Sequence, residues 1–502
     1  MPQAIRKIVI VGGGTAGWMS AASLARYAQT NTLQITVIES SALGTVGVGE
    51  ATVPNIVEFN RNLGIDEQTL IKATQATFKL GIQFEDWYQP GSRFFHPFAD
   101  FGLTIDQVEF HQYINRMKAA GHQLNIEDYC FPCCLAKAAH FAQPHPNPPS
   151  PLADYSYAYH FDASLYARFL QKYALQRGVE HIDATINQVN LEPANGFIRS
   201  VSLPDGTEIS ADLFIDCSGF QGLLIEQALH TGYEDWSEWL LCDSAIAVLT
   251  ERSGETLNPY TRCIARDAGW QWNIPLQHRT GNGYIYSSRY EDDSTAEQIL
   301  LANVAGKLIS QPRKLNFTPG RRKQIWHKNC FAIGLASGFL EPLESTSISL
   351  IQTAIAKLLS FFPDTDFNPA DIAEVNRLHN REMENIRDFL ILHYKLSQRA
   401  GSPFWQQCQS MKIPDSLAHK IALYQSRGHI AMYDNESFQP ASWIAMYQGF
   451  ALKAERYDPR ADTVDSALLA QKLAQMRNNI ASIASQSLTH QEFIRRHCPA
   501  PQ

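Results

Sequence analysis

Long runs of one kind of residue are missing from this 502-residue sequence. No run of lysine or arginine is longer than Arg321, Arg322 and Lys323, and 42 basic against 50 acidic residues leave a net charge of -8. Nucleic acids and anionic membrane surfaces bind basic patches, so neither is expected as a partner. No stretch approaches the ~20 apolar residues that span a bilayer, so no membrane segment is predicted.

Cysteine is too sparse and too scattered for a disulfide framework. The chain has nine cysteines, and the only cluster, CFPCC, contains Cys130, Cys133 and Cys134. A zinc site needs further ligands at suitable spacing, and no second cysteine pair follows, so no metal site is predicted. The first apolar run, IVIVGGG, has the pattern of a strand and lacks the cleavage pattern of a signal peptide. Reduced thiols and a cytoplasmic location are therefore expected.

Apolar periodicity predicts a globular α/β protein. Residues 6–38 predict a strand, a glycine turn, a helix and a second strand, which is one βαβ unit. Strand patterns recur in residues 179–218, and helical patterns dominate after about residue 370. We expect a discontinuous nucleotide-binding unit, substrate-side elements and a mostly helical C-terminal region. The nucleotide-binding unit comprises residues 1–50, 179–218 and 327–360. The substrate-side elements comprise residues 51–178 and 219–326, and the helical region comprises residues 361–502.

A glycine fingerprint joins the first predicted strand to the first predicted helix. Gly12, Gly14 and Gly17 form G-x-G-x-x-G. Glycines there let the backbone turn tightly and approach a pyrophosphate, which the positive end of the helix stabilises. Glu39 ends the second strand, where a carboxylate accepts hydrogen bonds from ribose hydroxyls. Ordinary turn glycines are the alternative, but the strand, helix and acid in these places favour a dinucleotide site.

Two later glycine turns favour FAD over NAD. They are DCSG at residues 216–219 and AIGLASG at residues 332–338. Large flavoproteins bring further strand ends to the flavin in this way, and a second fingerprint for a nicotinamide is missing. Electrons are therefore expected to arrive with FAD that is already reduced.

The segment GWQWNIP, residues 269–275, places two indoles two residues apart. This spacing puts Trp270 and Trp272 on one face of an extended strand. Pro275 cannot donate to a sheet ladder, so the strand should end or lie at a sheet edge there. Taken alone, the pair is best explained by core packing.

Several motifs together resemble the flavin-dependent tryptophan halogenase family. They are GGGTAGW, GVGEATVP (47–54), FKLGIQFEDW (78–87), YHFDASLYARFL (159–170), GWQWNIP and FLEPLESTSI (339–348). The resemblance implies an FAD-binding, Rossmann-like fold of the flavoprotein monooxygenase type. The residues it implies for cofactor binding are Gly12, Gly14, Thr15, Ala16, Gly17, Glu39, Gly49, Ala51, Gly334 and Leu335.

The resemblance also implies a division of the chemistry between two places. Reduced FAD from a separate flavin reductase would react with oxygen and with bound chloride or bromide to give hypohalous acid. In the family, the tryptophans of W-x-W-x-I-P separate the flavin from the substrate. The resemblance therefore implies this separating role for Trp270 and Trp272. The implied catalytic residues are Lys79 and Glu344, and the implied halide contacts are the backbone at Thr346 and Ser347.

Physical arguments support the catalytic pair without replacing the resemblance. Lys79 lies among apolar residues in TFKLG, where desolvation would lower the basicity of the amine and allow it to act as a nucleophile or a hydrogen-bond donor. A surface lysine is the alternative. Glu344 precedes a predicted helix and could stabilise and deprotonate the cation that forms when an electrophile attacks an indole. Simple capping of that helix is the alternative.

Two departures from the family pattern bear on specificity. Ser347 stands where the known tryptophan halogenases have glycine, and the late segment 435–450 shows no recognisable clamp for free tryptophan. We therefore expect a halogenase acting on an indole-like or other electron-rich aromatic. A flavin-dependent aromatic hydroxylase and a non-catalytic flavin-binding protein are the alternatives, and a homodimer is possible.

Overall fold

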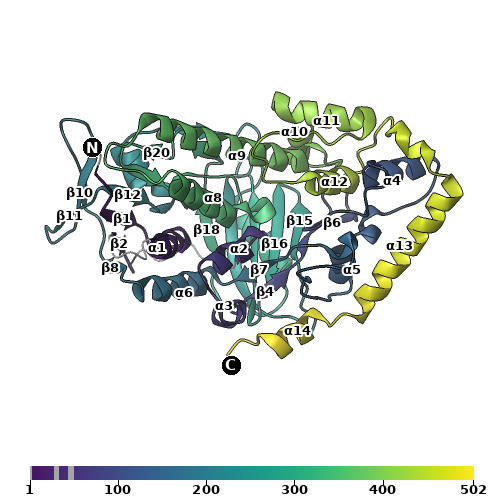
Figure 1. The fold of residues 1–502 in the computed structure, drawn as a ribbon, viewed down its shortest axis with the longest axis horizontal. Coiled ribbons are helices and arrows are strands. Elements are labelled where there is room, and N and C mark those ends of the chain that lie inside the picture. The colour runs from purple at the N-terminus through teal and green to yellow at the C-terminus, as the bar shows by residue number, and fades with distance from the viewer. Residues whose placement is uncertain (1–2, 28–32, 43–49, 502) are drawn as a thin grey trace.

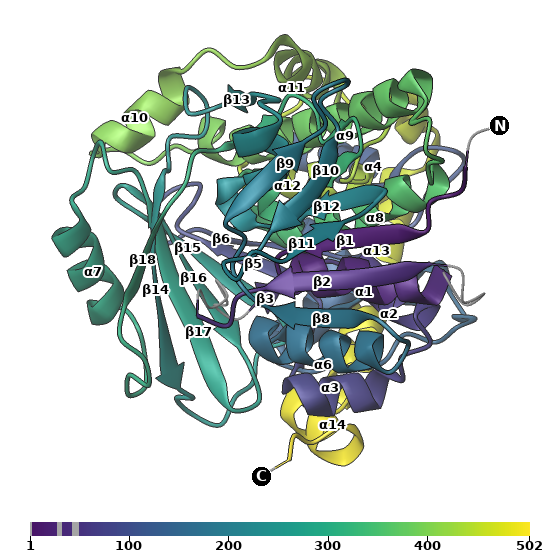
Figure 2. The same cartoon turned by 90° about the vertical axis from the view of Figure 1, so that its left-hand side faces the viewer.

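The computed structural model describes residues 3–27, 33–42 and 50–501. Its first layer is a six-stranded sheet with the order β20-β21-β12-β1-β2-β8, parallel throughout except for β20. Figure 2 shows β12, β1, β2 and β8 of this sheet. Strands from distant parts of the chain therefore lie side by side. They are β1 (Lys7–Val11), β2 (Gln34–Glu39), β8 (Glu180–Asp183), β12 (Leu213–Asp216), β20 (Trp326–His327) and β21 (Cys330–Ala332).

Both faces of this sheet are covered, which explains why β1 is apolar at successive positions. Ile8 and Ile10 belong to one hydrophobic cluster, while Val9 and Val11 belong to another. On the first side, α1 packs against α6 and α8; on the second lies the antiparallel sheet β11-β10-β9. These elements are α1 (Thr15–Tyr27), α6 (Ala163–Leu175), α8 (Thr346–Ser360), β9 (Gln188–Leu191), β10 (Ile198–Ser202) and β11 (Glu208–Ser210).

A seven-stranded sheet crosses the middle of the molecule (Figure 1). Its strand order is β18-β14-β17-β16-β15-β5-β6, and all seven strands are labelled in Figure 2. Adjacent strands within this sheet are antiparallel, except that β15 and β5 are parallel. GWQWNIP forms β16, a central strand that ends at the proline, as predicted. The strands are β5 (Gly81–Glu85), β6 (Arg93–Pro97), β14 (Ser244–Glu251), β15 (Thr261–Arg266), β16 (Gly269–Pro275), β17 (Arg279–Tyr286) and β18 (Arg313–Asn316).

Two three-stranded sheets, β3-β7-β4 and β13-β19-β22, complete the strand structure that matters for the site. Their strands are β3 (Glu50–Ala51), β4 (Thr77–Lys79), β7 (Ala158–Phe161), β13 (Tyr233–Asp235), β19 (Gly320–Arg322) and β22 (Gly338–Phe339). Short helices connect the layers: α2 (Asn55–Asn62), α3 (Glu67–Thr74), α4 (Phe110–Ala119), α5 (Phe131–Lys137) and α7 (Asp293–Ala302).

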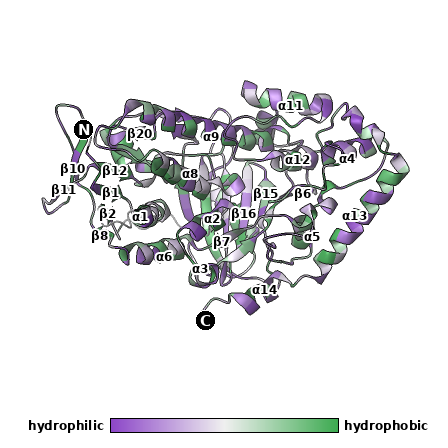
Figure 3. Cartoon of the chain, viewed as in Figure 1, coloured by the Kyte–Doolittle hydropathy of each residue, from purple (hydrophilic) through white to green (hydrophobic). Residues whose placement is uncertain are grey.

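The C-terminal part is helical. The long helix α9 (Pro369–Lys395) lies over the sheets, and α13 (Ser466–Gln486) runs along one edge of the molecule (Figure 1). Hydrophobic and hydrophilic residues alternate along α13 in Figure 3, as expected for a helix with one packed face. The other helices of this part are α10 (Pro403–Ser410), α11 (Asp415–Arg427), α12 (Pro440–Gly449) and α14 (His490–His497).

This mixed α/β architecture with a helical C-terminal part confirms the predicted fold class. All nine cysteines are free thiols, and eight of them are buried. Within the described ranges, none of the helices has the length and apolar character needed to cross a bilayer.

Candidate active site

A cavity of about 920 Å³ is lined by residues of both large sheets and by the first residues of α8. This volume is near the upper end for small-molecule and cofactor sites. Its walls include the ends of β1 and β2 on one side and the tryptophans of β16 on another. The cavity therefore joins the glycine fingerprint to the GWQWNIP strand, although more than 250 residues separate them.

The fingerprint forms the end of this cavity suited to an anion. Gly12 has φ of 105°, and a Cβ there would lie 2.2 Å from the carbonyl oxygen of Cys217, so only glycine fits. The first turn of α1 carries no acidic residue, and its residue Thr15 lines the cavity. The positive end of α1 therefore faces a space that a pyrophosphate would fill, which fits FAD.

Most of the predicted cofactor residues meet in this cavity. Those that line it are Gly12, Gly14, Thr15, Ala16, Glu39, Ala51, Gly334 and Leu335. Gly17 does not line the cavity, and its contact with the cofactor stays a prediction. A Cβ on Gly17 would lie 1.8 Å from the oxygen of Gly12, which makes it a packing position within the turn. Gly49 lies outside the described residues.

Trp270 and Trp272 form part of the cavity wall, with ring centres 6.1 Å apart. Both are buried, so core packing is part of their role, but they also face the cavity. Gly283 lies opposite Trp272 on β17, and a Cβ there would come within 2.0 Å of the indole. The glycine therefore leaves the space in which the Trp272 ring lies flat against the sheet.

Lys79, at the end of β4, is fully buried, so the alternative of a surface lysine is wrong. Its Nζ donates to the backbone oxygen of Thr52 and to Oγ of Ser345, each at 2.9 Å. Burial lowers the pKa of Lys79 and the nearby Glu344 partly restores it, giving about 7. Ser345 lines the cavity, so the amine is one hydrogen bond away from the cavity wall.

Glu344 is buried and held by two histidines. Nδ1 of His96 lies 2.8 Å from one carboxylate oxygen, and Nε2 of His393 lies 2.9 Å from the other. Burial alone would raise the pKa of Glu344, but the charge of His96 and the hydrogen bonds of both histidines outweigh it and lower the pKa to about 2. The carboxylate is therefore ionised at neutral pH. Simple helix capping does not describe it, because both its oxygens face imidazoles.

The start of α8 leaves its first amides without a side-chain cap. Ser345 is the N-cap residue, but its hydroxyl accepts from Lys79 instead of from the helix. Thr346 and Ser347 line the cavity at this positive helix end. Ser347 has no left-handed backbone conformation, so serine fits this position as well as glycine. Glu344 and Ser345, with φ of 66° and 60°, are strained instead.

Four residues of this site were not predicted from the sequence: His96, His393, Glu341 and Tyr394. His96 and His393 hold Glu344, while Glu341 accepts hydrogen bonds from Trp270 and Tyr394. Glu341 lies within the quoted motif FLEPLESTSI, so a second carboxylate in that motif was visible. The histidines lie on β6 and α9, and nothing in the local sequence pattern points from them to Glu344.

The glycine turn at the start of α1, at one end of this cavity, places the protein among dinucleotide-binding proteins. Comparisons with known proteins narrow this class. The chain matches the model of the tryptophan halogenase family over residues 7–466. It is 34% identical over 521 residues to the 7-chloro-L-tryptophan 6-halogenase KtzR of Kutzneria sp. (strain 744), covering 97% of this chain and 99% of the relative.

Solved structures of flavin-dependent halogenases have the same fold as this chain. The flavin-dependent halogenase BrvH from Brevundimonas sp. BAL3 superposes with a TM-score of 0.96 at 48% identity, covering 98% of this chain and 99% of that one. Xcc4156, a flavin-dependent halogenase from Xanthomonas campestris, gives 0.95 at 46% identity, covering 99% of each chain. The chain belongs to the tryptophan halogenase family. It is a flavin-dependent halogenase that uses FAD and a halide, with an aromatic substrate and a separate flavin reductase.

Proposed function

We propose that Lys79 and Glu344 form the halogenation centre, and that Trp270 and Trp272 separate it from the flavin. The burial of Lys79, hydrogen-bonded to Ser345 directly beside Glu344, carries this assignment. A charged amine is costly to bury, so a functional reason is expected where none of the described residues forms an ion pair with it at contact distance. The amide groups of Thr346 and Ser347 are proposed to hold the halide.

FAD would be held by the glycine turn, the α1 end, Glu39, Ala51, Gly334 and Leu335. When bound and reduced, it supplies, with oxygen, the oxidising equivalents that convert a halide into hypohalous acid. Lys79 would donate a hydrogen bond to this small oxidant and orient it toward the aromatic substrate. Glu344, ionised, would stabilise the cationic ring and then accept its proton. The two histidines keep the carboxylate fixed for that step.

Halide-dependent product mass tests this function. Incubation with FAD, a flavin reductase, oxygen, bromide and an indole should give a product heavier by bromine in place of hydrogen. A product that gains oxygen regardless of halide would instead support the hydroxylase alternative.

We infer that the substrate presents an indole-like ring without a free amino-acid group. Only two acidic residues lie between positions 430 and 450, Asp434 and Glu436, and Asp434 is exposed. The carboxylate of Glu436 is already bound by Lys420, by the backbone N–H of Tyr433 at 3.0 Å, and by the indole of Trp443 at 3.3 Å. It therefore has little capacity left for a substrate ammonium group.

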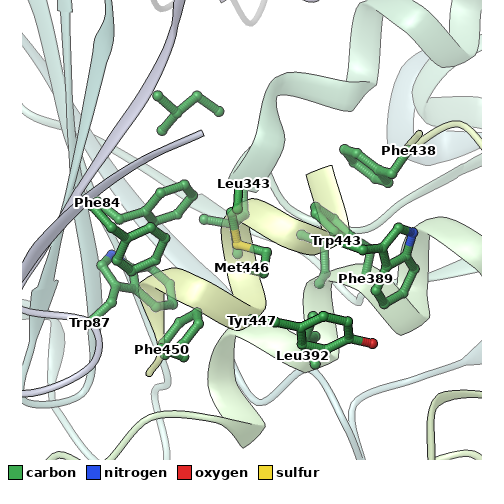
Figure 4. Packing of buried hydrophobic residues seen from close by; sticks show 14 of the residues in the cluster. Phe84, Trp87, Leu343, Phe389, Leu392, Phe438, Trp443, Met446, Tyr447 and Phe450 are labelled. Carbon is green, nitrogen blue, oxygen red and sulfur yellow. The ribbon is translucent and has the colours of Figure 1, made fainter. Parts of the chain in front are cut away.

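The surroundings of Glu344 are instead aromatic. Phe389 and Phe438 stack with ring centres 3.8 Å apart, and the ring of His96 lies 5.9 Å from Phe389. Trp443 meets Phe389 edge to face in the same cluster (Figure 4). Such surroundings favour an uncharged ring over a zwitterion, whose two charges need paired partners when buried.

Indole is therefore expected to be brominated with a kcat/KM roughly tenfold above that of tryptophan, which corresponds to about 1.4 kcal/mol of unpaired charge. Tryptamine and indole-3-propionate serve as matched controls, because each carries one of the two charges. Both should fall between indole and tryptophan. A clear preference for tryptophan would refute the inference.

The purified chain should not consume NADH or NADPH by itself. Its one dinucleotide fingerprint leads into the proposed flavin cavity, and a second fingerprint is missing from the sequence. Absorbance at 340 nm should stay at background with FAD, oxygen, halide and substrate present, and should fall when a reductase is added. Steady consumption without reductase would contradict this expectation.

A cytoplasmic location and a homodimer are further proposals. The free thiols support a reducing compartment. Light scattering after size-exclusion chromatography tests the dimer.

A further inference from the structure

Glu341 is a buried carboxyl group that the halogenation scheme leaves without a role. It is 1% exposed and does not line the cavity. Its Oε1 accepts from the indole N–H of Trp270 at 3.1 Å and from the hydroxyl of Tyr394 at 2.7 Å, while Oε2 has no partner. Its backbone has φ of 120°, which is unfavourable for a residue with a side chain.

We propose that Glu341 is a positioning residue that anchors the Trp270 indole in the wall between the flavin cavity and the Lys79–Glu344 centre. The inference rests on the separating role proposed above for Trp270. It adds a second function to the motif FLEPLESTSI, in which Glu344 serves the substrate and Glu341 serves the wall.

Two other aromatic rings contact the Trp270 indole. Its ring centre lies 6.1 Å from Trp272 and 6.2 Å from Trp87, contacts that restrain the ring without using its N–H. Within the described chain, Glu341 is the hydrogen-bond partner recorded for that N–H. An indole without it would leave a buried donor unsatisfied and could rotate to pack in other ways.

The same carboxyl oxygen ties the wall to the helix that supports the catalytic glutamate. Tyr394 follows His393 on α9, and His393 holds Glu344. One acceptor atom therefore links β16 to α9 and keeps the wall in register with the halogenation centre. A shift of Trp270 would therefore change both the flavin cavity and the positions of the residues that hold Glu344.

The site also favours an uncharged carboxyl. Burial raises the pKa of Glu341, the hydrogen bonds of Tyr394 and Trp270 lower it in part, and the result is about 8. A neutral carboxyl adds no charge beside the path of a halide or an oxidant. Glutamine is also neutral and presents a carbonyl oxygen in the same place, so Glu341→Gln should preserve the anchor, whereas Glu341→Leu should remove it.

Two measurements test the anchor. The first is coupling, which is the amount of halogenated indole formed per reduced FAD oxidised. Glu341→Leu should lower the coupling about tenfold, which is the effect of one net hydrogen bond. Glu341→Gln should keep the coupling within about twofold of wild type. The second is the NMR spectrum of protein labelled with [15N-indole]tryptophan, in which Trp270→Phe assigns the Trp270 resonance. That resonance should move upfield in Glu341→Leu and stay in Glu341→Gln.

Glu382→Leu is the matched control, because it removes another buried carboxylate that lies outside the cavity lining and pairs with Lys357. Its coupling should equal that of wild type. In a Trp270→Phe background, Glu341→Leu should add clearly less loss than it does in wild type, since the Trp270 donor is already gone and only the Tyr394 hydrogen bond remains to be lost. Full additivity, or a wild-type coupling in Glu341→Leu, would overturn the proposal.

The NMR measurement does not depend on catalysis. An unshifted Trp270 resonance in Glu341→Leu would overturn the anchor whatever the activity. Wild-type coupling in Trp270→Phe would instead overturn the separating role of the wall. If Glu341→Leu does not fold, Glu341→Asp keeps the carboxyl but withdraws it from Trp270, and the same loss of coupling and the same upfield shift are expected.

Discussion

Lys79→Ala is expected to reduce halogenation by about a thousandfold or more, while FAD affinity and the oxidation of reduced FAD stay near wild type. The removal of one oriented donor from a water-excluded site typically costs 10²–10³ in rate, and the loss of a group that also guides the oxidant costs more. Lys79 does not line the cavity, so the cofactor contacts remain. Single-turnover assays with photoreduced FAD, bromide and indole measure both rates.

Lys79→Met provides the matched control, because it keeps the volume of the side chain and removes only the amine. It should be equally inactive. It should also be more stable than wild type at neutral pH, because the folded pKa of Lys79, about 7, lies below its ordinary value of 10.5. The unfolded chain therefore binds more protons between these values, so the contribution of Lys79 to stability rises with pH across that window. Retained halogenation, or loss of FAD, would contradict the assigned role.

The pH dependence of halogenation should follow the same group. If the protonated amine donates to the oxidant, the rate falls as pH rises through about 7, and this step disappears in Lys79→Arg, whose side chain stays charged. A rate that rises through the same range would show that the free amine acts as a nucleophile instead.

Glu344→Gln is expected to lower kcat for halogenation by roughly a hundredfold or more, with little change in flavin oxidation. Glutamine keeps the shape but lacks the charge that stabilises a cationic ring and the basic oxygen that accepts its proton. The low pKa of Glu344, about 2, means that its ionisation does not limit the rate between pH 5 and pH 9. The pH step assigned to Lys79 should therefore persist in this variant.

Two outcomes would contradict this assignment. One is an equal loss of flavin oxidation in Glu344→Gln, which would place the residue at the flavin. The other is a rate close to that of wild type. Glu382→Gln is a suitable control, because Glu382 is a buried carboxylate on α9 that pairs with Lys357 away from the cavity.

The dinucleotide end of the site was predictable because its parts are adjacent in sequence. Strand, turn and helix follow one another within residues 7–27, and the end of the next strand supplies Glu39. Gly17 belongs to the same local pattern. The fingerprint requires a glycine there, but whether the missing Cβ makes room for a ligand or for the oxygen of Gly12 depends on the path of the turn.

The proposed halogenation centre was predictable only as a set of residues carried by a family resemblance. Lys79, Trp270 and Glu344 lie on β4, β16 and the turn before α8, and no periodicity links these segments. For Lys79, the local sequence allowed both a surface and a buried side chain. For Glu344, it allowed both a helix cap and a substrate base. Each ambiguity depended on partners more than a dozen residues away.

The sequence by itself therefore determined the elements and their chemistry: the glycine turn, the apolar strands that become buried on both faces, the end of β16 at Pro275, and the free thiols. The tertiary structure alone decided which charges meet. In the folded protein the hydroxyl of Ser345 accepts a hydrogen bond from Lys79, and His96 and His393 contact the carboxylate of Glu344. One oxygen of Glu341 accepts hydrogen bonds from both Trp270 and Tyr394. The physical reason is that periodicity records the local geometry of the chain, whereas burial, and with it every pKa shift in this site, depends on how distant segments pack.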